Sequence, residues 1–153
     1  MIEKSNSLGG NLLAGGVPNL KNDDLKLCNW YINQLKKLSV DIKLNTSANE
    51  TTVNNSQADV IIMATGSTPS IPKFDTKEEI LSASDVLLNP SLASENVVII
   101  GGGLVGCETG LWLSNMGKKV SIVEMLPVIC GGPHNMPFMN WDMMKDLLPY
   151  NHI

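Results

Sequence analysis

Three glycines in the middle of the chain have a spacing that could bind phosphate groups. Gly101, Gly103 and Gly106 stand at G-x-G-x-x-G spacing, directly after the apolar run 97–100. The first glycine permits a tight turn, the second lets the backbone approach a pyrophosphate, and the third lets a helix pack closely on a sheet. Phosphates would lie at the N-terminus of that helix, where free N–H groups and the helix dipole favour negative charge. The pattern therefore predicts a dinucleotide-binding turn.

An acidic residue follows the glycines at the distance that such a site requires. Glu124 ends the next apolar segment, about 20 residues after the turn. A carboxylate there accepts hydrogen bonds from the ribose hydroxyls of NAD and repels the 2′-phosphate of NADP. No arginine near Glu124 could bind that phosphate. We therefore expect NAD(H) rather than NADP(H), contacted by Gly101, Gly102, Gly103, Leu104, Val105, Gly106, Glu108 and Glu124.

Glu108 has a second interpretation, because an acid in the first turn of a helix favours the helix dipole whatever the function. Other side chains offer no catalytic chemistry. His134 and His152 have no acidic or cysteine partner at a useful spacing, and Tyr31 is followed four residues later by Leu35 rather than by a lysine. No nucleophile or general acid is apparent, so a cofactor must carry any redox chemistry.

The elements that position the glycine turn are predicted with the periodicities of a strand and a helix. Residues 97–100 are β-branched and precede the turn, a helix of about 104–116 follows it, and 118–124 reads as the second strand. Gly117 is placed to end the helix. A further helix is predicted over about 137–148, where Met136, Met139, Met143 and Met144 cluster and are interpreted as core filling.

The N-terminal half is predicted to contain a helix of about 23–38, preceded by a glycine-containing loop over 5–18. Alternation at 40–44 predicts a short strand, and the polar stretch 45–57 a loop or a weak exposed hairpin. The apolar run 59–66 predicts a strand buried on both faces.

Prolines follow that apolar run, so the chain is predicted to leave the sheet there as an extended linker. We place a domain boundary between Gly66 and Lys73, which gives domains of 1–70 and 71–153. Residues 84–88 are predicted to form a short helical or turn element.

Composition limits the class of protein. The 153 residues carry a formal net charge of −4, without the stripe of basic residues that nucleic acids require. No run approaches the roughly 20 apolar residues of a membrane-spanning helix, and no signal peptide is apparent. The three cysteines, Cys28, Cys107 and Cys130, are widely spaced and form no metal-binding pattern. We expect a cytoplasmic protein with free thiols, no metal, and neither nucleic acid nor membrane as a partner.

The segments together resemble the pyridine nucleotide–disulfide oxidoreductase family, which are flavoproteins with two dinucleotide sites. Residues 101–108 match the NAD half, and Ala64, Thr65 and Gly66 resemble the second FAD fingerprint. Glu3 resembles the acid that binds the FAD ribose, and a Gly-Gly turn passes close to the flavin. The resemblance therefore implies that FAD is lined by Glu3, Gly9, Gly10, Ala64, Thr65 and Gly66.

A closer resemblance is to the C-terminal region of the enoate reductase and 2,4-dienoyl-CoA reductase-like enzymes, relatives of old yellow enzyme. It is carried by residues 8–12, the Trp30-Tyr31 pair, 103–109 and 123–127. In that family NADH reduces FAD, and electrons pass through an iron–sulfur cluster to FMN in an N-terminal barrel. The barrel reduces an activated carbon–carbon double bond. The resemblance thus implies NAD(H) and FAD here, with FMN and the cluster in a larger parent enzyme.

The departures from that family indicate a fragment. The flavin domain's glycine-rich turn, the iron–sulfur cysteines and the FMN barrel have no counterpart in the sequence, so its natural partners include the missing parts of the parent. Exposed sheet edges would also favour self-association. The predicted fold is α/β, a Rossmann-like FAD/NAD(P)-binding region with a partial flavin segment followed by a partial NAD-binding βαβ domain. The alternatives are a non-catalytic nucleotide-binding or structural module, and a different Rossmann dehydrogenase, whose substrate domain and acid–base residue are not visible.

Overall fold

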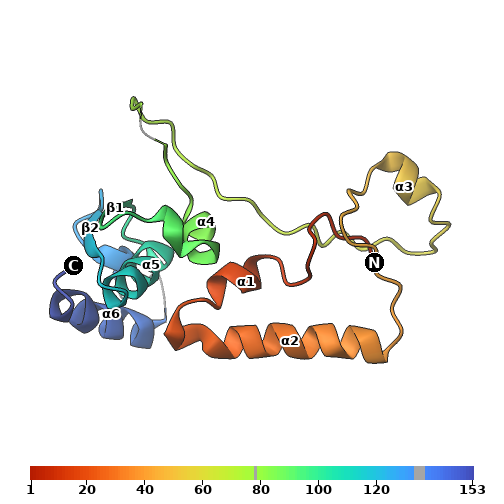
Figure 1. The fold of residues 1–153 in the computed structure, drawn as a ribbon, viewed down its shortest axis with the longest axis horizontal. Helices are drawn as coiled ribbons and strands as arrows, with labels where there is room; N and C mark the ends of the chain where they lie inside the picture. The colour runs from red at the N-terminus through yellow and green to blue at the C-terminus, as the bar shows by residue number, and fades with distance from the viewer. Residues whose placement is uncertain (78, 133–136) are drawn as a thin grey trace. The chain divides into compact units, whose positions relative to one another are not determined.

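The computed structural model describes residues 1–77, 79–132 and 137–153, which form two compact units (Figure 1). Unit 1 comprises Met1–Val17 and Lys21–Phe74, and unit 2 comprises Pro18–Leu20 and Asp75–Ile153. The division of function between domains 1–70 and 71–153 stays a prediction, because compactness does not report what each part binds.

Unit 2 contains the predicted strand, turn, helix and strand. Strand β1 (Asn96–Ile100) and strand β2 (Lys119–Val123) pair in parallel, with Asn96 opposite Lys119 and Ile100 opposite Val123. Helix α5 (Leu104–Asn115) connects them. Parallel neighbours need such a crossover, so the three elements form a βαβ unit. The α/β prediction is confirmed here.

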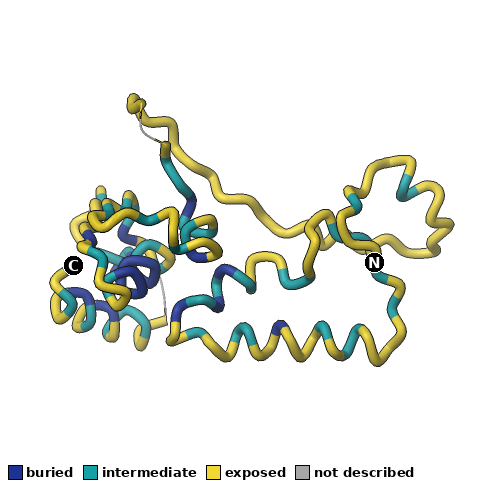
Figure 2. The backbone as a smooth tube through the Cα atoms, in the orientation of Figure 1, coloured by how far each residue is buried: buried dark blue, intermediate teal, exposed yellow. Residues whose placement is uncertain are grey.

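Helix α5 lies close to the sheet because residue 110 is a glycine. A Cβ atom at Gly110 would lie 3.2 Å from the Cδ1 atoms of both Ile99 and Ile122. The helix ends as predicted, with Gly117 in the left-handed region at φ 82°. Figure 2 shows the buried residues concentrated on this helix, where every residue from 107 to 113 is buried.

The core of unit 2 lies between α5 and helix α6 (Phe138–Tyr150). Its buried members are Cys107, Leu111, Cys130, Met144 and Leu148. The prediction of a methionine core holds for Met144, which is fully buried. It is wrong for Met139 and Met143, which are exposed, because they lie on the other face of α6. Met136 lies outside the described residues.

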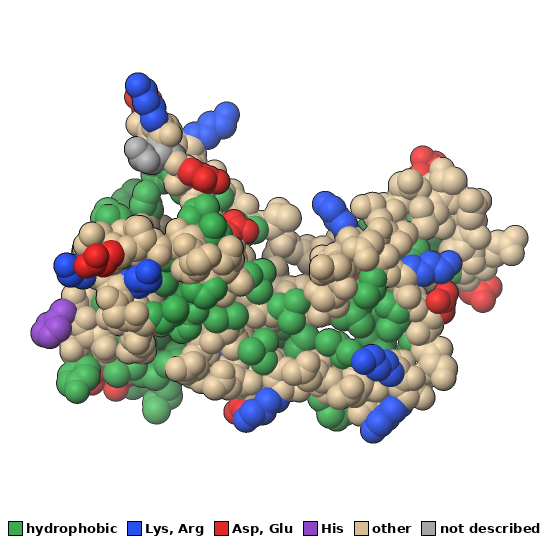
Figure 3. Space-filling view, viewed as in Figure 1, with side chains coloured by type: hydrophobic (Ala, Val, Ile, Leu, Met, Phe, Trp, Pro, Cys, Tyr) green, Lys and Arg blue, Asp and Glu red, His purple; other side chains and the backbone are tan. Residues whose placement is uncertain are grey.

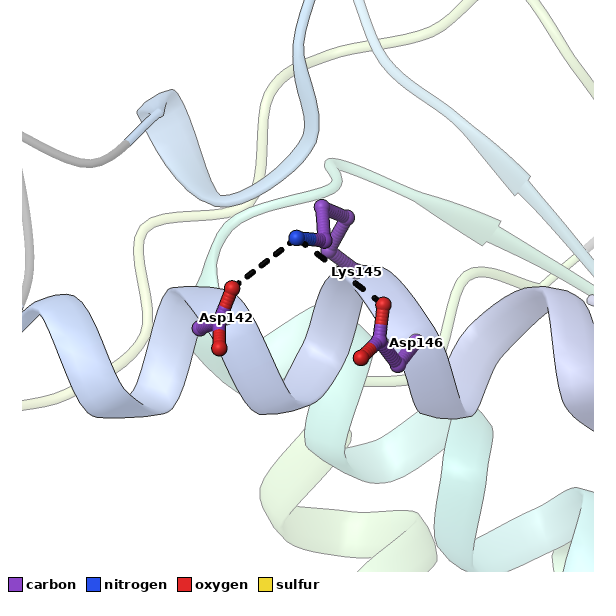
Figure 4. A network of polar contacts seen from close by, with 3 residues as sticks. All are labelled: Asp142, Lys145 and Asp146. Carbon is purple, nitrogen blue, oxygen red and sulfur yellow. Dashed lines mark hydrogen bonds and ion pairs between the residues drawn. The ribbon is translucent and has the colours of Figure 1, made fainter.

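The exposed face of α6 carries a small charge network. Lys145 Nζ lies 2.9 Å from Asp142 Oδ1 and 3.9 Å from Asp146 Oδ1 (Figure 4). The hydrogen bond to Asp142 raises the pKa of Lys145 above its ordinary value. Because all three side chains face solvent, the network contributes little to stability.

The remaining described elements of unit 2 and its edges are one short helix and three 3₁₀ turns. The predicted element at 84–88 is helix α4 (Ala83–Leu88), which starts with a capping box between Ser82 and Asp85. The 3₁₀ turns are η1 (Asn19–Lys21), η2 (Pro90–Leu92) and η3 (Ile129–Gly131).

Unit 1 is helical where helices were predicted and also where they were not. Helix α2 (Asn22–Lys37) confirms the predicted helix. The expected loop over 5–18 instead contains helix α1 (Asn11–Gly15), which packs on α2. Gly16 permits this contact, since a Cβ atom there would lie 2.6 Å from Leu25 Cγ.

The polar stretch 45–57 contains helix α3 (Glu50–Asn54) rather than a loop or hairpin alone. The Asn49 side chain caps the helix by accepting hydrogen bonds from Thr52 N and Thr52 Oγ1, both at 2.8 Å. An asparagine followed by an acid is a helix-start signal that outweighs the low helix propensity of threonine.

Both strands predicted in unit 1 are wrong. Around 40–44 there is one isolated parallel bridge, Lys43 to Ile2. Residues 59–66 are extended but unpaired, and they are exposed rather than buried, with Ile62 84% accessible. A strand needs a neighbouring strand to satisfy its N–H and C=O groups. In the described part of unit 1 no such neighbour lies beside 59–66.

Many large apolar side chains are exposed on the surface of the chain, and Figure 3 shows them in green. Across the described ranges, no helix combines the length and apolar character needed to cross a bilayer.

Candidate functional site

The glycine turn lies at the carboxyl end of β1, and two of its glycines are required by the fold itself. Gly101 has a φ of 106°, which residues with a Cβ atom rarely adopt, and its N–H donates to Val123 O at 2.8 Å. A Cβ atom on Gly106 would collide with the Gly101 carbonyl oxygen. These two residues shape the turn and seat α5 against it.

Gly103 differs from both, because nothing in the fold requires a glycine there. Its φ of −70° and ψ of 180° suit any residue, and no atom lies within 4 Å of the place where a Cβ atom would be. Gly103 is exposed and is the N-cap of α5, whose first N–H groups receive no side-chain cap. The missing Cβ atom leaves this helix end open to an approaching anion, as a pyrophosphate requires.

Glu124 directly follows β2 and points back at the turn. Its Oε2 accepts the Gly102 N–H at 2.6 Å, and its Oε1 accepts the Leu126 N–H at 2.8 Å. The bond from Leu126, followed by that from Gly102, lowers the pKa of Glu124 below its ordinary value. A charged carboxylate is therefore fixed beside the glycine turn, where the sequence predicts the ribose.

Gly102, between the first two glycines of the motif, has a structural role that the motif spacing did not predict. Gly102 is buried, and a Cβ atom there would lie 3.0 Å from Glu124 Cβ and 3.3 Å from Glu124 Oε2. A glycine at 102 thus makes room for the acid of the site.

The remaining predicted NAD residues belong to α5. Val105 is 62% exposed beside the turn, and Leu104 is half-buried. Glu108 is 6% exposed and is the fifth residue of α5, so its expected place in the first helical turn is wrong. Glu108 is buried on the helix, and its contact with the nucleotide stays a prediction.

The predicted flavin residues all lie in unit 1. The Asn11 side chain donates to Ser67 O at 3.3 Å and to Ser67 Oγ at 3.1 Å. Asn11 follows Gly9 and Gly10, and Ser67 follows Ala64, Thr65 and Gly66, so the two glycine segments lie together.

The fit of a flavin to these residues is poor in the described part of unit 1. Ala64, Thr65 and Gly66 are exposed, and no strand–turn–helix unit accompanies them to hold a pyrophosphate. Glu3 accepts the Ser5 N–H at 2.7 Å, which lowers the pKa of its carboxyl. The residues of unit 1 do not fit FAD on their own, whereas the turn in unit 2 has the open helix end and the acid that a dinucleotide requires.

Two buried thiols beside Gly102, Cys107 and Cys130, were not predicted from the sequence. The Gly102 carbonyl oxygen accepts the Cys130 N–H at 2.5 Å and the Cys107 thiol at 3.2 Å, and Cys130 Sγ donates to Cys107 Sγ at 3.3 Å. Burial, followed by the hydrogen bond with Cys130, raises the pKa of Cys107 to about 12. All three cysteines are free. Cys107 and Cys130 are too far apart in sequence for their contact to be read from spacing.

No metal centre accompanies the turn in the described ranges, where no three His, Cys, Asp or Glu side chains are grouped to hold an ion. His152 is exposed at the end of unit 2, and His134 lies outside the described residues.

Comparison with known proteins identifies the family. Residues 26–146 match the pyridine nucleotide-disulphide oxidoreductase family. The chain belongs to this family. Its members have the Rossmann-type fold that binds FAD and NAD(P), which confirms the predicted fold class and agrees with the βαβ unit of α5, β1 and β2.

Proteins similar to this chain include several reductases. A cinnamate reductase from Clostridium sporogenes is 46% identical over 155 residues, covering 100% of this chain and 23% of the relative. A bilirubin reductase from Mediterraneibacter gnavus is 36% identical over 84% of this chain and 20% of its own length. An NADH oxidase from Thermoanaerobacter brockii is 34% identical over 95% of this chain and 23% of its own length.

Among solved structures, a complex of 2-naphthoyl-CoA reductase with 2-naphthoyl-CoA matches with a TM-score of 0.87 and 28% identity. The match covers 99% of this chain and 23% of that chain. The sequence thus spans about a quarter of the length of these relatives, and the resemblance to the enoate reductase-like enzymes is confirmed.

Proposed function

We propose that this chain is the NADH-binding region of a flavin-dependent oxidoreductase. The observation that carries the proposal is Gly103, whose backbone conformation suits residues other than glycine and whose surroundings leave room for a Cβ atom. A glycine at this position serves an approaching ligand rather than the fold. The ligand that suits an open helix N-terminus beside a charged carboxylate is a dinucleotide, with its pyrophosphate at Gly103 and its ribose at Glu124.

Glu124 supports NADH over NADPH. Its lowered pKa keeps the carboxylate charged at neutral pH, so it accepts hydrogen bonds from ribose hydroxyls and repels a 2′-phosphate. The sequence contains no arginine to offset that repulsion.

In the whole enzyme we propose that NADH delivers hydride to FAD, which Glu3, Gly9, Gly10, Ala64, Thr65 and Gly66 help to bind. The names of the relatives refer to conjugated compounds such as cinnamate and 2-naphthoyl-CoA. This supports a parent that reduces an activated double bond. The resemblance to the enoate reductase-like enzymes implies that FMN and an iron–sulfur cluster lie in the part of the parent that this chain does not cover.

A second function is favoured by the exposed state of Ala64, Thr65 and Gly66. Because unit 1 alone does not fit FAD, the 153-residue chain would bind NADH without passing electrons to a flavin. Under this alternative it is a nucleotide-binding module.

An equilibrium titration with NADH and NADPH, followed by nicotinamide fluorescence, tests the first proposal. Saturable NADH binding with markedly weaker NADPH binding supports it, whereas equal affinities would contradict the role of Glu124. Adding FAD to the NADH complex separates the two functions. Bleaching of the flavin absorbance supports hydride transfer by the chain, and a stable NADH complex with unchanged flavin supports the module.

A further inference from the structure

The two thiols behind the glycine turn form a site that the proposed function does not use. Cys107 is fully buried near the start of α5, and Cys130 is 4% exposed on the turn η3. Their Sγ atoms are 3.3 Å apart and joined by a hydrogen bond. We propose that Cys107 and Cys130 are a redox modification site, which a low-molecular-weight disulfide such as oxidised glutathione converts to an intramolecular disulfide.

The geometry favours a bond between these two atoms. A disulfide has a length near 2.0 Å, so the sulfurs must approach by roughly 1.3 Å from their separation of 3.3 Å. The backbone of Cys130 and the side chain of Cys107 are already hydrogen-bonded to the same atom. Cys130 N donates to Gly102 O, and the Cys107 thiol donates to that oxygen as well. Closure therefore needs only a short approach of two sulfur atoms whose residues already bind the same carbonyl oxygen.

The order of the two steps follows from the surroundings of each thiol. Cys107 is held in a helix, and its raised pKa keeps it protonated at neutral pH. Cys130 lies on a short turn beside Val128, which is 47% exposed, and its own φ of 59° is a conformation that favours glycine. Local opening of this turn exposes Cys130 first.

The reaction balances as two successive exchanges. The Cys130 thiolate attacks one sulfur of oxidised glutathione, a mixed disulfide forms, and one glutathione leaves as a thiol. Cys107 then loses its proton and attacks Cys130 Sγ, which expels the second glutathione as a thiol. Two cysteine thiols are oxidised, one glutathione disulfide is reduced, and both protons end on the two glutathione molecules.

Cys28 is an internal control for this reaction. It is 3% exposed and free, as buried as the other two, but it lies in unit 1 and not in unit 2 with Cys107 and Cys130. Burial alone would treat the three thiols alike, whereas the proposal distinguishes the pair from Cys28.

The test equilibrates the full chain in buffers of increasing oxidised-to-reduced glutathione ratio, blocks free thiols after acid quenching, and maps the peptides by mass spectrometry. The expected result is loss of two alkylatable thiols, a peptide linking Cys107 to Cys130, and an alkylated Cys28. Dithiothreitol should restore both thiols. In Cys107→Ser, Cys130 should carry glutathione instead.

Three outcomes would overturn the proposal: three free thiols at every ratio, separate glutathione adducts on Cys107 and Cys130 in the unaltered chain, or a bridge that includes Cys28. Mapping on the unaltered chain keeps the test decisive even if a serine variant fails to fold. Because no nucleotide is present, the result is independent of whether NADH binds.

Discussion

The carboxylate of Glu124 is held by the backbone of Gly102. Glu124 Oε2 accepts the Gly102 N–H at 2.6 Å, and a Cβ atom at 102 would lie only 3.0 Å from Glu124 Cβ. The acid that follows β2 is thus held in place by the glycine turn that follows β1. The expected ribose-binding group is oriented before any ligand arrives, which reduces the ordering that binding requires.

Replacing Gly102 tests this relationship. In Gly102→Ala the new methyl group would lie 3.0 Å from Glu124 Cβ, so the carboxylate must move away from the turn. We expect NADH affinity to fall by up to about tenfold. Titration of NADH fluorescence measures the change. Ser121→Ala, an exposed position on β2, is the matched control and should bind as the unaltered chain does. Unchanged affinity in Gly102→Ala would mean that the position of Glu124 does not matter.

The ionisation of Glu124 gives a prediction for pH. Its pKa is lowered in the folded chain, so the stability from its bonds to Leu126 and Gly102 is fully present above the ordinary glutamate pKa. This stability is lost as the pH falls through the lowered value. Glu124→Gln should therefore melt at a lower temperature than the unaltered chain at neutral pH, and the difference should shrink as the solution is acidified. Thermal melts at several pH values measure it, and a difference that grows in acid contradicts the assignment.

The same Glu124→Gln variant tests nucleotide preference. Removing the negative charge removes the repulsion of a 2′-phosphate, so the ratio of NADH to NADPH affinity should fall towards one. The titrations are made at neutral pH, where the unaltered carboxylate is charged. If the ratio stays unchanged, some other group selects the nucleotide.

Two glycines of α5 should respond differently to alanine. In Gly106→Ala the methyl group meets the Gly101 carbonyl, which belongs to the backbone and cannot turn away. We expect a loss of about 1–3 kcal/mol in the free energy of unfolding. In Gly110→Ala the contacts at 3.2 Å are with the Cδ1 ends of Ile99 and Ile122. Their adjustment is offset by a helix-propensity gain of about 1 kcal/mol, so the net change should be small.

Urea unfolding of both variants measures this difference. Lys145→Met, which removes the exposed ion pairs of Figure 4, serves as a control that should leave the midpoint nearly unchanged. A larger loss in Gly110→Ala than in Gly106→Ala would show that the helix does not lie on the turn as described.

Oxidation of Cys107 and Cys130 should weaken NADH binding. The disulfide removes the thiol that donates to Gly102 O and draws η3 towards α5, which disturbs Gly102, the residue whose N–H also holds Glu124. Titration of the oxidised chain, before and after dithiothreitol, should show weaker binding that recovers on reduction. Cys28→Ala should behave in the same way as the unaltered chain. Equal NADH affinity in both redox states would show that oxidation of the two thiols does not affect the nucleotide site.

The parts of the molecule that follow from the sequence are those whose determinants are local. The strand 97–100, the turn and α5 were predictable because β-branched residues, glycine spacing and helical periodicity act within a few residues of one another. The run 59–66 shows the limit of this reasoning. Its composition is that of a buried strand, but a strand exists only beside another strand, and composition does not supply the neighbour.

The site was predictable to a similar extent. Gly101, Gly103, Gly106 and Glu124 were identified by spacing, and the structure places all four around one turn. The reason for Gly102 could not be predicted, because it depends on the side-chain direction of a residue 22 positions away. The contact of Cys107 with Cys130 depends in the same way on how η3 folds back on α5.

The central claim is that the open helix end at Gly103 binds the NADH pyrophosphate, and Gly103→Val tests it most directly. Valine fits the backbone at φ −70°, and its Cβ position has no atom within 4 Å beyond its chain neighbours, so the variant should fold. Its melting temperature should fall only slightly, because valine is a poorer N-cap residue than glycine. We predict saturable NADH binding by the unaltered chain and binding at least about tenfold weaker in the variant. Equal NADH affinity in the two proteins would contradict the claim.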